Sequence, residues 1–175
     1  MASPATFLRR FARARRGSAA VEFAFVAAPF VALVFAIIEL GLVFLVQTSL
    51  DNAISDTARL IRTGELQASS GTATTFKAAI CDNMSWLGNG CASNLNIDVR
   101  VFTSFAGQTP PNPAASGTFV TTGLTFSPGV GRDIVLVRGF YQWDLITPLL
   151  NDGLVNLGGS KRLITSTVTF RNEPF

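Results

Sequence analysis

The feature that most constrains this chain is one long apolar run near its N-terminus. From Phe23 to Val46 the sequence reads FAFVAAPFVALVFAIIELGLVFLV, and Glu39 is its only charged residue. A bilayer core about 30 Å thick needs about 20 apolar residues in a helix, so this run is long enough to span a membrane once. It exceeds the usual apolar region of a secretory signal, and no A-x-A site follows it. The alternative, a buried core helix of a globular domain, fits the length and the lack of polar positions less well.

Charge is segregated along the chain, and this predicts the orientation of the span. The arginines that precede the run, with no acid among them, are Arg9, Arg10, Arg13, Arg15 and Arg16. Basic residues beside a span stay on the cytoplasmic side, so we expect the residues after Val46 to lie outside the cytoplasm. The whole chain has 14 basic and 11 acidic residues, so the part after these arginines is slightly acidic. It shows no basic stripe of the kind that binds nucleic acid, and we expect no nucleic-acid partner.

Glu39 lies inside the apolar run, toward its outer end. An acid at such a depth is costly, and it usually faces a protein partner. We therefore predict that Glu39 contacts another subunit of an assembly. The alternatives are a protonated side chain that faces its own helix and a side chain that reaches outward to the membrane surface.

Beyond the apolar run the helix is predicted to continue. Apolar residues recur at helical spacing on one face, and polar residues occupy the others. The apolar stripe consists of Val46, Leu50, Ile54, Ala58 and Ile61. Gly64 is a typical stop signal, so the pattern predicts one helix from about Ser18 to Thr63, with its outer half packed under a globular head. Two helices with a break near Gly41 are the alternative.

A second helix fits residues 75–87, and two cysteines flank its end. Phe76, Ile80 and Met84 fall on one face of this helix. Outside the cytoplasm an oxidising compartment favours a disulfide between Cys81 and Cys91, with two free thiols as the alternative. A zinc site is not expected, because the sequence supplies no third or fourth soft ligand.

Three segments alternate or run apolar in the way that is typical of β-strands, and they complete the predicted fold. They are residues 95–101, 134–143 and 163–170. A loop rich in Pro, Gly, Ser and Thr covers residues 106–118, and a short helical turn is expected around residues 148–157. We therefore predict an α+β fold, in which a long N-terminal transmembrane and stalk helix packs against a small periplasmic head with an antiparallel sheet of about three strands. The predicted divisions are a basic leader (1–17), the helix (18–63, with the span at 23–46) and the head (64–175).

The residue types argue against catalysis. The chain has no histidine, which removes the usual general base and the commonest metal ligand. Its later carboxylates, Asp98, Asp133, Asp144 and Asp152, show no catalytic spacing. Residues 129–131 lack the Lys-Ser/Thr that completes a phosphate loop. We expect no enzyme activity, no cofactor, no metal and no small-molecule substrate.

The join between the leader and the span carries the most specific motif. It reads RRGSAAVEF from Arg15 to Phe23: basic residues end at a glycine, small residues follow, and Glu22 precedes the apolar run. This join resembles the processing site of type IV-like prepilins of the tight-adherence (Tad) class. Over most of its length the chain is similar to TadE-like minor pilins, also called pseudopilins. Further matching stretches are residues 56–59, the paired cysteines, residues 128–129, residues 137–143 and the final FRNEPF.

The resemblance implies a role for each residue of the join. A membrane prepilin peptidase would cut between Gly17 and Ser18 on the cytoplasmic side. Glu22 would then be the fifth residue of the mature chain, placed to neutralise the Ser18 amine of a neighbouring subunit. Phe23 stands where the major pilins often have tyrosine, which favours a minor subunit. The alternative for Glu22 is a residue that reaches the lipid headgroups.

The resemblance also implies a location and partners. The chain would be a single-pass protein of the inner membrane, with the N-terminus in the cytoplasm and the head in the periplasm. It would act with other minor pilins and the Tad pilus machinery in surface adhesion and biofilm growth. A membrane-tethered ligand-binding or sensory domain and a periplasmic enzyme stay open as alternatives, although neither requires the join at Gly17 and Glu22.

Overall fold

The computed structural model describes residues 17–106, 109–115, 117–147 and 151–175. The predicted leader, apart from Gly17, lies outside these residues. The chain divides into two compact units, residues 1–38 and residues 39–175. The boundary between the units falls at Glu39, inside the predicted span.

The fold is α+β, as the sequence predicted. Its described helices are α2 (Ser18–Arg62), α3 (Glu65–Ala68), α4 (Ala73–Asn83), the 3₁₀ helix η2 (Ser85–Gly90), α5 (Cys91–Asn94) and α6 (Asn151–Leu154). Its strands are β1 (Leu95–Phe102), β2 (Ile134–Asp144) and β3 (Lys161–Arg171). They form one antiparallel sheet in the order β1-β2-β3. The predicted three-stranded sheet is confirmed, and each strand lies where the pattern placed it.

The long helix α2 has no break at Gly41, so the single-helix prediction holds. Among the described residues it is the one helix long and apolar enough to cross a membrane. In the first unit its large apolar side chains are exposed, as Phe23 (74%) and Phe30 (63%) illustrate. Gly64 follows the end of the helix with φ 81°, a left-handed conformation that glycine adopts without strain.

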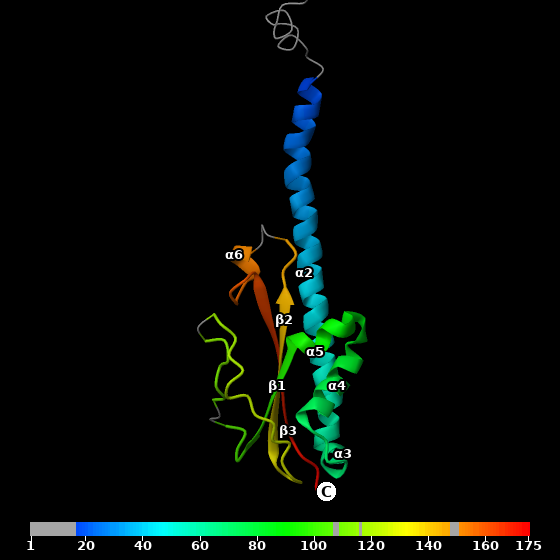
Figure 1. Ribbon diagram of the computed structural model, residues 1–175, viewed down its shortest axis with the longest axis vertical. Coiled ribbons are helices and arrows are strands. Elements are labelled where there is room, and N and C mark those ends of the chain that lie inside the picture. The colour runs from blue at the N-terminus through cyan, green and yellow to red at the C-terminus, as the bar shows by residue number, and fades with distance from the viewer. Residues whose placement is uncertain (1–16, 107–108, 116, 148–150) are drawn as a thin grey trace, which may run out of the picture. The chain divides into compact units, whose positions relative to one another are not determined.

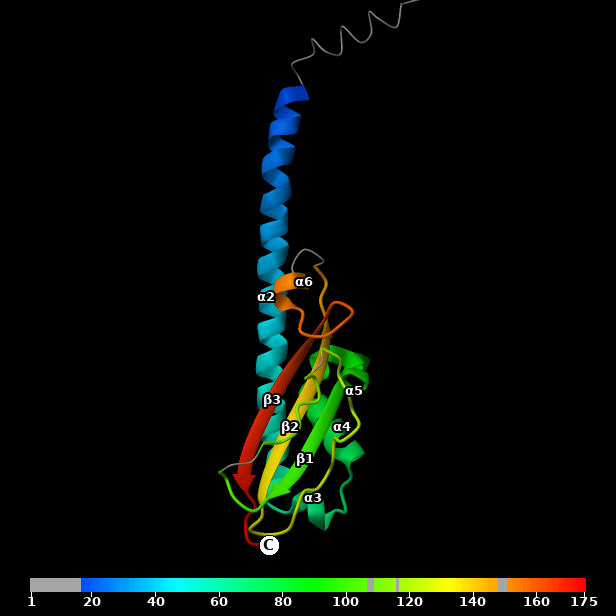
Figure 2. The ribbon, with the colours of Figure 1, turned by 90° about the vertical axis from the view of Figure 1, so that its left-hand side faces the viewer.

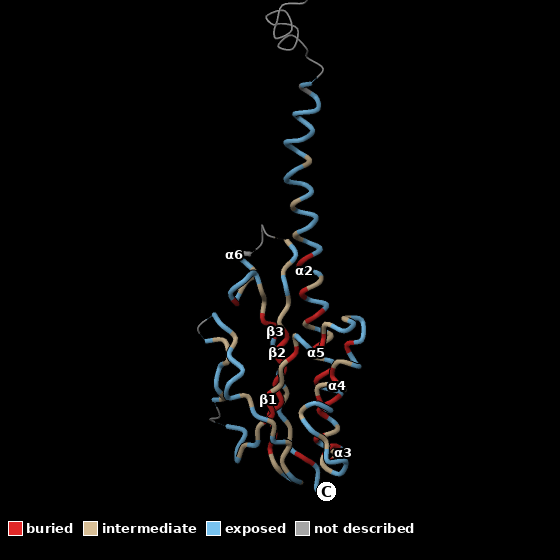
Figure 3. Tube along the Cα trace, in the orientation of Figure 1, coloured by how far each residue is buried: buried red, intermediate tan, exposed pale blue. Residues whose placement is uncertain are grey.

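The second unit is built as a sheet between two unlike layers (Figure 1). The part of α2 from Glu39 onward packs with α4 and α5 against one face of the sheet. The long connection from β1 to β2 covers part of the other face (Figure 2). Figure 3 shows that buried residues concentrate where α2 meets the sheet. The predicted apolar stripe of α2 forms the centre of this core, since its residues from Val46 to Ile61 are 0–3% exposed.

The register of the sheet places alternate residues on the two faces. Val99 pairs with Val137, and Val137 pairs with Val168. This row of valines belongs to the face that packs against α2. On the opposite face Asp98 pairs with Arg138, and Arg138 pairs with Thr167. The period-two alternation therefore places one face of the sheet under the helix and the other face, where Asp98 and Arg138 lie beside the apolar Phe140, under the connection.

Gly139 allows α2 to lie close to the sheet. A Cβ atom at this position would lie 2.1 Å from Cδ1 of Ile54 and 3.6 Å from Cδ1 of Leu50. Ile54 and Leu50 are both 0% exposed, so a Cδ1 atom displaced by this Cβ would have to move within the core. The glycine therefore sets how closely the helix and the middle strand approach each other.

The second helix is shorter than predicted. The sequence pattern placed it over residues 75–87, whereas α4 ends at Asn83 and the chain continues as the 3₁₀ helix η2. Gly88, with φ 58° and ψ −149°, interrupts η2. The start of α4 is fixed by a capping box in which Thr72 and Thr75 exchange hydrogen bonds between side chain and backbone N–H.

The last residues of the chain join three elements. Asn172 is buried, and its side-chain amide donates hydrogen bonds to the carbonyls of Pro128 (3.0 Å) and Val130 (2.9 Å). The backbone N–H of Glu173 donates to the carbonyl of Arg62 at the end of α2. The final FRNEPF motif therefore ties β3, the connection before β2 and the end of α2 together.

We predict that Gly139→Val lowers the stability of the second unit. The added side chain would overlap Ile54, and overpacking of this kind costs about 1–3 kcal/mol. Thermal unfolding of the full chain in detergent micelles measures the change. Gly158→Ala is the matched control, because a Cβ there meets nothing within 4 Å.

The double variant Gly139→Val with Ile54→Ala should regain part of the lost stability, since it removes the overlapping atoms. A Gly139→Val variant with the same melting temperature as the wild type would contradict the proposed close approach of α2 to β2.

Candidate functional site

The residues of the predicted processing site lie at the start of α2. Gly17 is exposed, and a Cβ built on it would meet nothing within 4 Å. Ser18 is the first residue of the helix. The Gly17–Ser18 bond therefore stands at the boundary of α2, and a cut there would leave the whole helix intact.

Glu22 and Phe23 lie one turn further along the same helix. Both are exposed, with Phe23 at 74%. Because Glu22 follows Ser18 by four residues, the two lie about 6 Å apart along the helix axis. The structure thus brings four of the five predicted processing and assembly residues together at one end of α2, and their roles stay predictions.

Glu39, the fifth, belongs to the second unit and is 1% exposed. Its Oε2 accepts hydrogen bonds from the backbone N–H groups of Ile146 and Thr147, both at 3.0 Å, and from the Thr147 hydroxyl at 3.1 Å. Its Oε1 accepts from the Trp143 indole at 3.4 Å. Trp143 lies in β2, and Ile146 and Thr147 follow its end. All the hydrogen bonds to Glu39 described here therefore come from the same chain.

These contacts give Glu39 an intramolecular environment that the sequence did not reveal. The donors lie between 104 and 108 positions further along the chain, and no local pattern links them to the acid. The predicted contact of Glu39 with another subunit is not tested by a single chain and stays a prediction. Within the chain, the carboxylate holds the residues after β2 against α2.

The cysteines form the expected disulfide. Cys81 and Cys91 are joined with an S–S distance of 2.04 Å and a Cα–Cα distance of 5.6 Å. The bond links α4 to α5, which leads directly into β1. Free thiols, the alternative, are not observed at these positions. The bond reduces the conformational entropy of the unfolded chain, and it fixes the position of α5 just before β1 begins.

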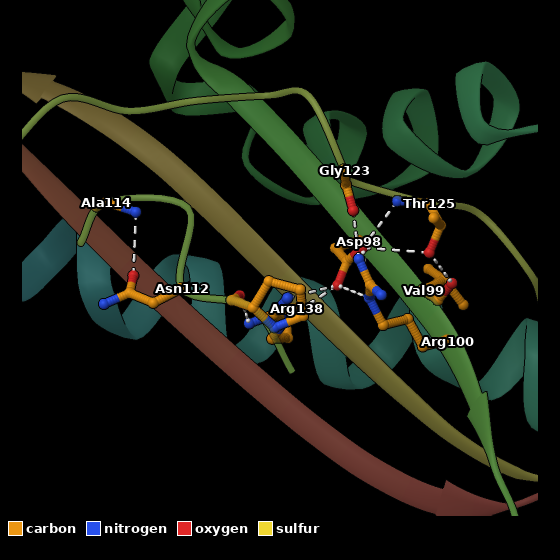
Figure 4. A network of polar contacts seen from close by, with 9 residues as sticks. Asp98, Val99, Arg100, Asn112, Ala114, Gly123, Thr125 and Arg138 are labelled. Atoms are coloured by element: carbon orange, nitrogen blue, oxygen red, sulfur yellow. Dashed lines mark hydrogen bonds and ion pairs between the residues drawn. The ribbon is translucent and has the colours of Figure 1, made fainter. Parts of the chain in front are cut away.

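A polar network on the outer face of the sheet was not predicted (Figure 4). Its centre is Asp98, whose side chain is fully buried. Asp98 accepts hydrogen bonds from Arg138 (Nη2, 2.7 Å; Nε, 3.1 Å) and from Arg100 (Nε, 2.8 Å). The backbone N–H of Thr125 donates a further one at 2.8 Å.

The two arginines extend the network into the connection between β1 and β2. Arg138 Nη1 donates to the carbonyl of Pro111 at 2.9 Å, and Arg100 Nη2 donates to the carbonyl of Gly123. Together with Thr125, these contacts anchor the connection, which also packs Phe119 and Leu124 against Phe140. The sequence did contain one signal: Asp98 and Arg100 occupy alternate polar positions of one strand, and Arg138 lies opposite Asp98 in the register.

The network changes the acidity of Asp98. Burial by itself would raise the pKa of the carboxyl, but hydrogen bonds from Arg100, Arg138 and Thr125 outweigh it, and the pKa lies below its usual value. Asp98 therefore stays ionised at neutral pH and neutralises one of its two arginines.

A groove lies beside this network. Its volume is about 440 Å³. Arg138 and Phe140 of β2, the row Thr165, Thr167 and Thr169 of β3, and Pro110 and Pro113 of the connection are among the residues that line it. Arg138 also stacks over the ring of Phe140, with 5.2 Å between the guanidinium carbon and the ring centroid. The described residues contain no group of three or more His, Cys, Asp or Glu side chains that could hold a metal ion.

One comparison with known proteins found a match, in the N-terminal part of the chain. Residues 17–59 match the family model described as TadE-like protein. The match begins at the predicted processing site and extends along α2 almost to its end. Searches of curated proteins and of solved structures found no match.

We predict that Asp98→Asn destabilises the second unit at neutral pH. Removing one partner of a buried ion pair costs about 3–5 kcal/mol, because the arginines lose their counter-charge. Since the pKa of Asp98 is lowered by folding, its contribution is present above the unfolded pKa of about 3.9 and is lost as pH falls through the folded pKa.

Melting temperatures of wild type and Asp98→Asn, compared from neutral pH down to about pH 2, measure this effect. The gap between them should narrow below about pH 4. Asp82→Asn, at an exposed position, is the control and should follow the wild type. A constant gap across the whole range would contradict the role of the Asp98 charge.

Proposed function

We propose that this chain, whose residues 17–59 match the TadE-like family, is a minor pilin or pseudopilin of a Tad-type pilus. It would be anchored by one membrane span, processed after Gly17 by a prepilin peptidase, and used in pilus assembly for surface adhesion. The observation that carries the proposal is the coincidence of the motif and the fold. The family match and α2 begin together, at residues 17 and 18, where the basic leader ends.

The proposed mechanism uses the charges that cleavage creates and removes. The cut would release the arginines that hold the leader in the cytoplasm and would leave a new amine at Ser18. Glu22, one turn later, would neutralise the Ser18 amine of a neighbouring subunit. Because desolvation offsets much of the Coulombic gain of such a pair, its main effect would be on the register between subunits.

The exposed side chains of α2 support packing in a bundle. In the first unit Phe23, Phe25 and Phe30 are each more than 60% exposed. Lipid surrounds such a surface before assembly, and neighbouring helices can replace the lipid in a fibre or its base. In this proposal the protein acts by assembly and is not an enzyme, the leader is cytoplasmic, and the second unit is periplasmic.

A membrane-tethered binding domain is the second candidate, and the groove beside Arg138 favours it. The groove offers a guanidinium, an aromatic ring and a row of threonine hydroxyls to a ligand. A tethered domain would share the span and the fold, but it would have no use for cleavage after Gly17. Processing therefore separates the two candidates.

We expect the native protein, isolated from its membrane, to begin at Ser18. N-terminal sequencing or mass spectrometry of the wild type measures this, and Gly17→Leu should keep the leader because the peptidase would no longer accept the site. Gly41→Leu is the matched control, since this helical glycine also has open space around it. A chain that keeps its arginines in a host with an active peptidase would favour the tethered binding domain.

We expect Glu22→Ala to insert into the membrane and to fail in assembly. Loss of the pair with a neighbouring amine should lower co-purification with partner minor pilins about tenfold, the equivalent of about 1.4 kcal/mol. Glu39→Leu should have a milder effect. Asp56→Ala, which changes an exposed acid of the same helix, is the control and should assemble normally. Normal assembly and adhesion with Glu22→Ala would limit Glu22 to contact with lipid headgroups.

A further inference from the structure

The exposed apolar surface of α2 continues past Glu39 into the second unit. Leu40 (40% exposed), Phe44 (70%) and Leu45 (49%) face away from the sheet, while Val43 and Val46 are buried against it. After Leu45 the exposed positions of α2 change character: Thr48, Asn52, Ser55 and Asp56 are all polar. The side of the helix that meets no protein is therefore apolar as far as Leu45.

This change of character marks the level at which the helix leaves lipid. Leu45 follows Glu39 by six residues, so Glu39 lies about 9 Å deeper along the helix axis. At that level one side of α2 carries the exposed apolar residues, and the other side is covered by Trp143, Ile146 and Thr147. The residues that cover Glu39 consequently lie at the depth of the apolar band.

The chemistry of the covering segment suits that depth. Non-helical backbone is tolerated in a membrane only where its polar groups find partners within the protein. Glu39 provides them, since its carboxylate accepts the backbone N–H groups of both Ile146 and Thr147. Trp143, whose indole N–H donates to the same carboxylate, is of the residue type that gathers at membrane surfaces.

The side chain of Ile146 is the exposed part of this segment. It is 67% exposed, although its own N–H is bound to a buried carboxylate. We propose that residues 143–147 are a membrane-docking element, which inserts Ile146 into the outer interfacial layer of the bilayer that α2 spans. The proposal rests on the proposed membrane span of α2. Glu39 then lowers the free-energy cost of insertion, because its carboxylate accepts the hydrogen bonds of two backbone N–H groups that would otherwise face lipid.

In this proposal lipid, and not a second protein, covers the exposed side of residues 143–147, for two reasons. The N–H of Ile146 is bound to Glu39, the residue before Leu40, and Leu40 and Phe44 are exposed apolar residues of the predicted span. Asp144, the exposed charged residue of the segment, is already paired with Lys161 at 2.8 Å, and the carboxylate of Glu39 is 1% exposed, so neither acid is left without a partner inside the chain. A neighbouring subunit that covers the segment is the competing outcome of the test.

Single-cysteine variants of the full chain test the proposal. Ile146→Cys, Val130→Cys and Phe30→Cys would be labelled with bimane without reductant, so that the disulfide stays closed, and reconstituted into phosphatidylcholine–phosphatidylglycerol vesicles. Val130 is the matched control, because it is also 67% exposed but lies in the connection bound to Asn172 near the end of α2. Phe30 reports the span itself.

We expect brominated lipid to quench the labels at Ile146 and Phe30 at least twofold more than the label at Val130, and iodide to quench only Val130. If brominated lipid quenches the label at Phe30 but not the label at Ile146, the docking element is overturned and the span is retained. Loss of quenching at Phe30 would overturn the span and, with it, the docking element. An Ile146 label that brominated lipid does not quench, and that partner minor pilins shield from iodide, would assign the surface to a subunit and overturn the proposal.

Discussion

The contact between α2 and the middle strand depends on the missing side chain of Gly139. Because a Cβ there would lie 2.1 Å from Ile54, the glycine is what lets the apolar stripe of the helix meet the sheet closely. Other elements complete the same core. Phe76 and Ile80 of α4 share the same apolar cluster, and the disulfide at the end of α4 connects that cluster to the start of β1.

The opposite face of the sheet combines apolar packing with electrostatic contacts. Phe119 and Leu124 of the connection pack against Phe140 of β2, and directional contacts hold other parts of the connection in place. Asp98 supplies them through Arg100 and Arg138, whose remaining N–H groups reach the carbonyls of Gly123 and Pro111. Arg138, which binds this buried carboxylate, also lines the groove, so the network shapes part of the surface that a ligand of the second unit would meet.

Glu39 connects the membrane chemistry of α2 with the packing of the second unit. An acid in an apolar helix is costly in lipid, and four hydrogen bonds from Trp143, Ile146 and Thr147 offset that cost. The same bonds satisfy two backbone groups that follow β2. If α2 spans the membrane as proposed, Glu39 marks the level where protein replaces lipid on one side of the helix. The compact second unit begins at this residue.

The sequence by itself determined the features that rest on local periodicity: the long apolar helix that ends at Arg62 and the three strands. The disulfide was also predicted, from the short separation of the cysteines and their expected location outside the cytoplasm. Only the tertiary structure decided the partners of Glu39 and Asp98, and the extent of α4. Apart from Arg100, the donors to Glu39 and Asp98 lie between 27 and 108 positions away, and chain folding alone brings such groups within hydrogen-bonding distance. A one-dimensional pattern records which face a residue occupies, but the groups it meets there depend on how the layers pack.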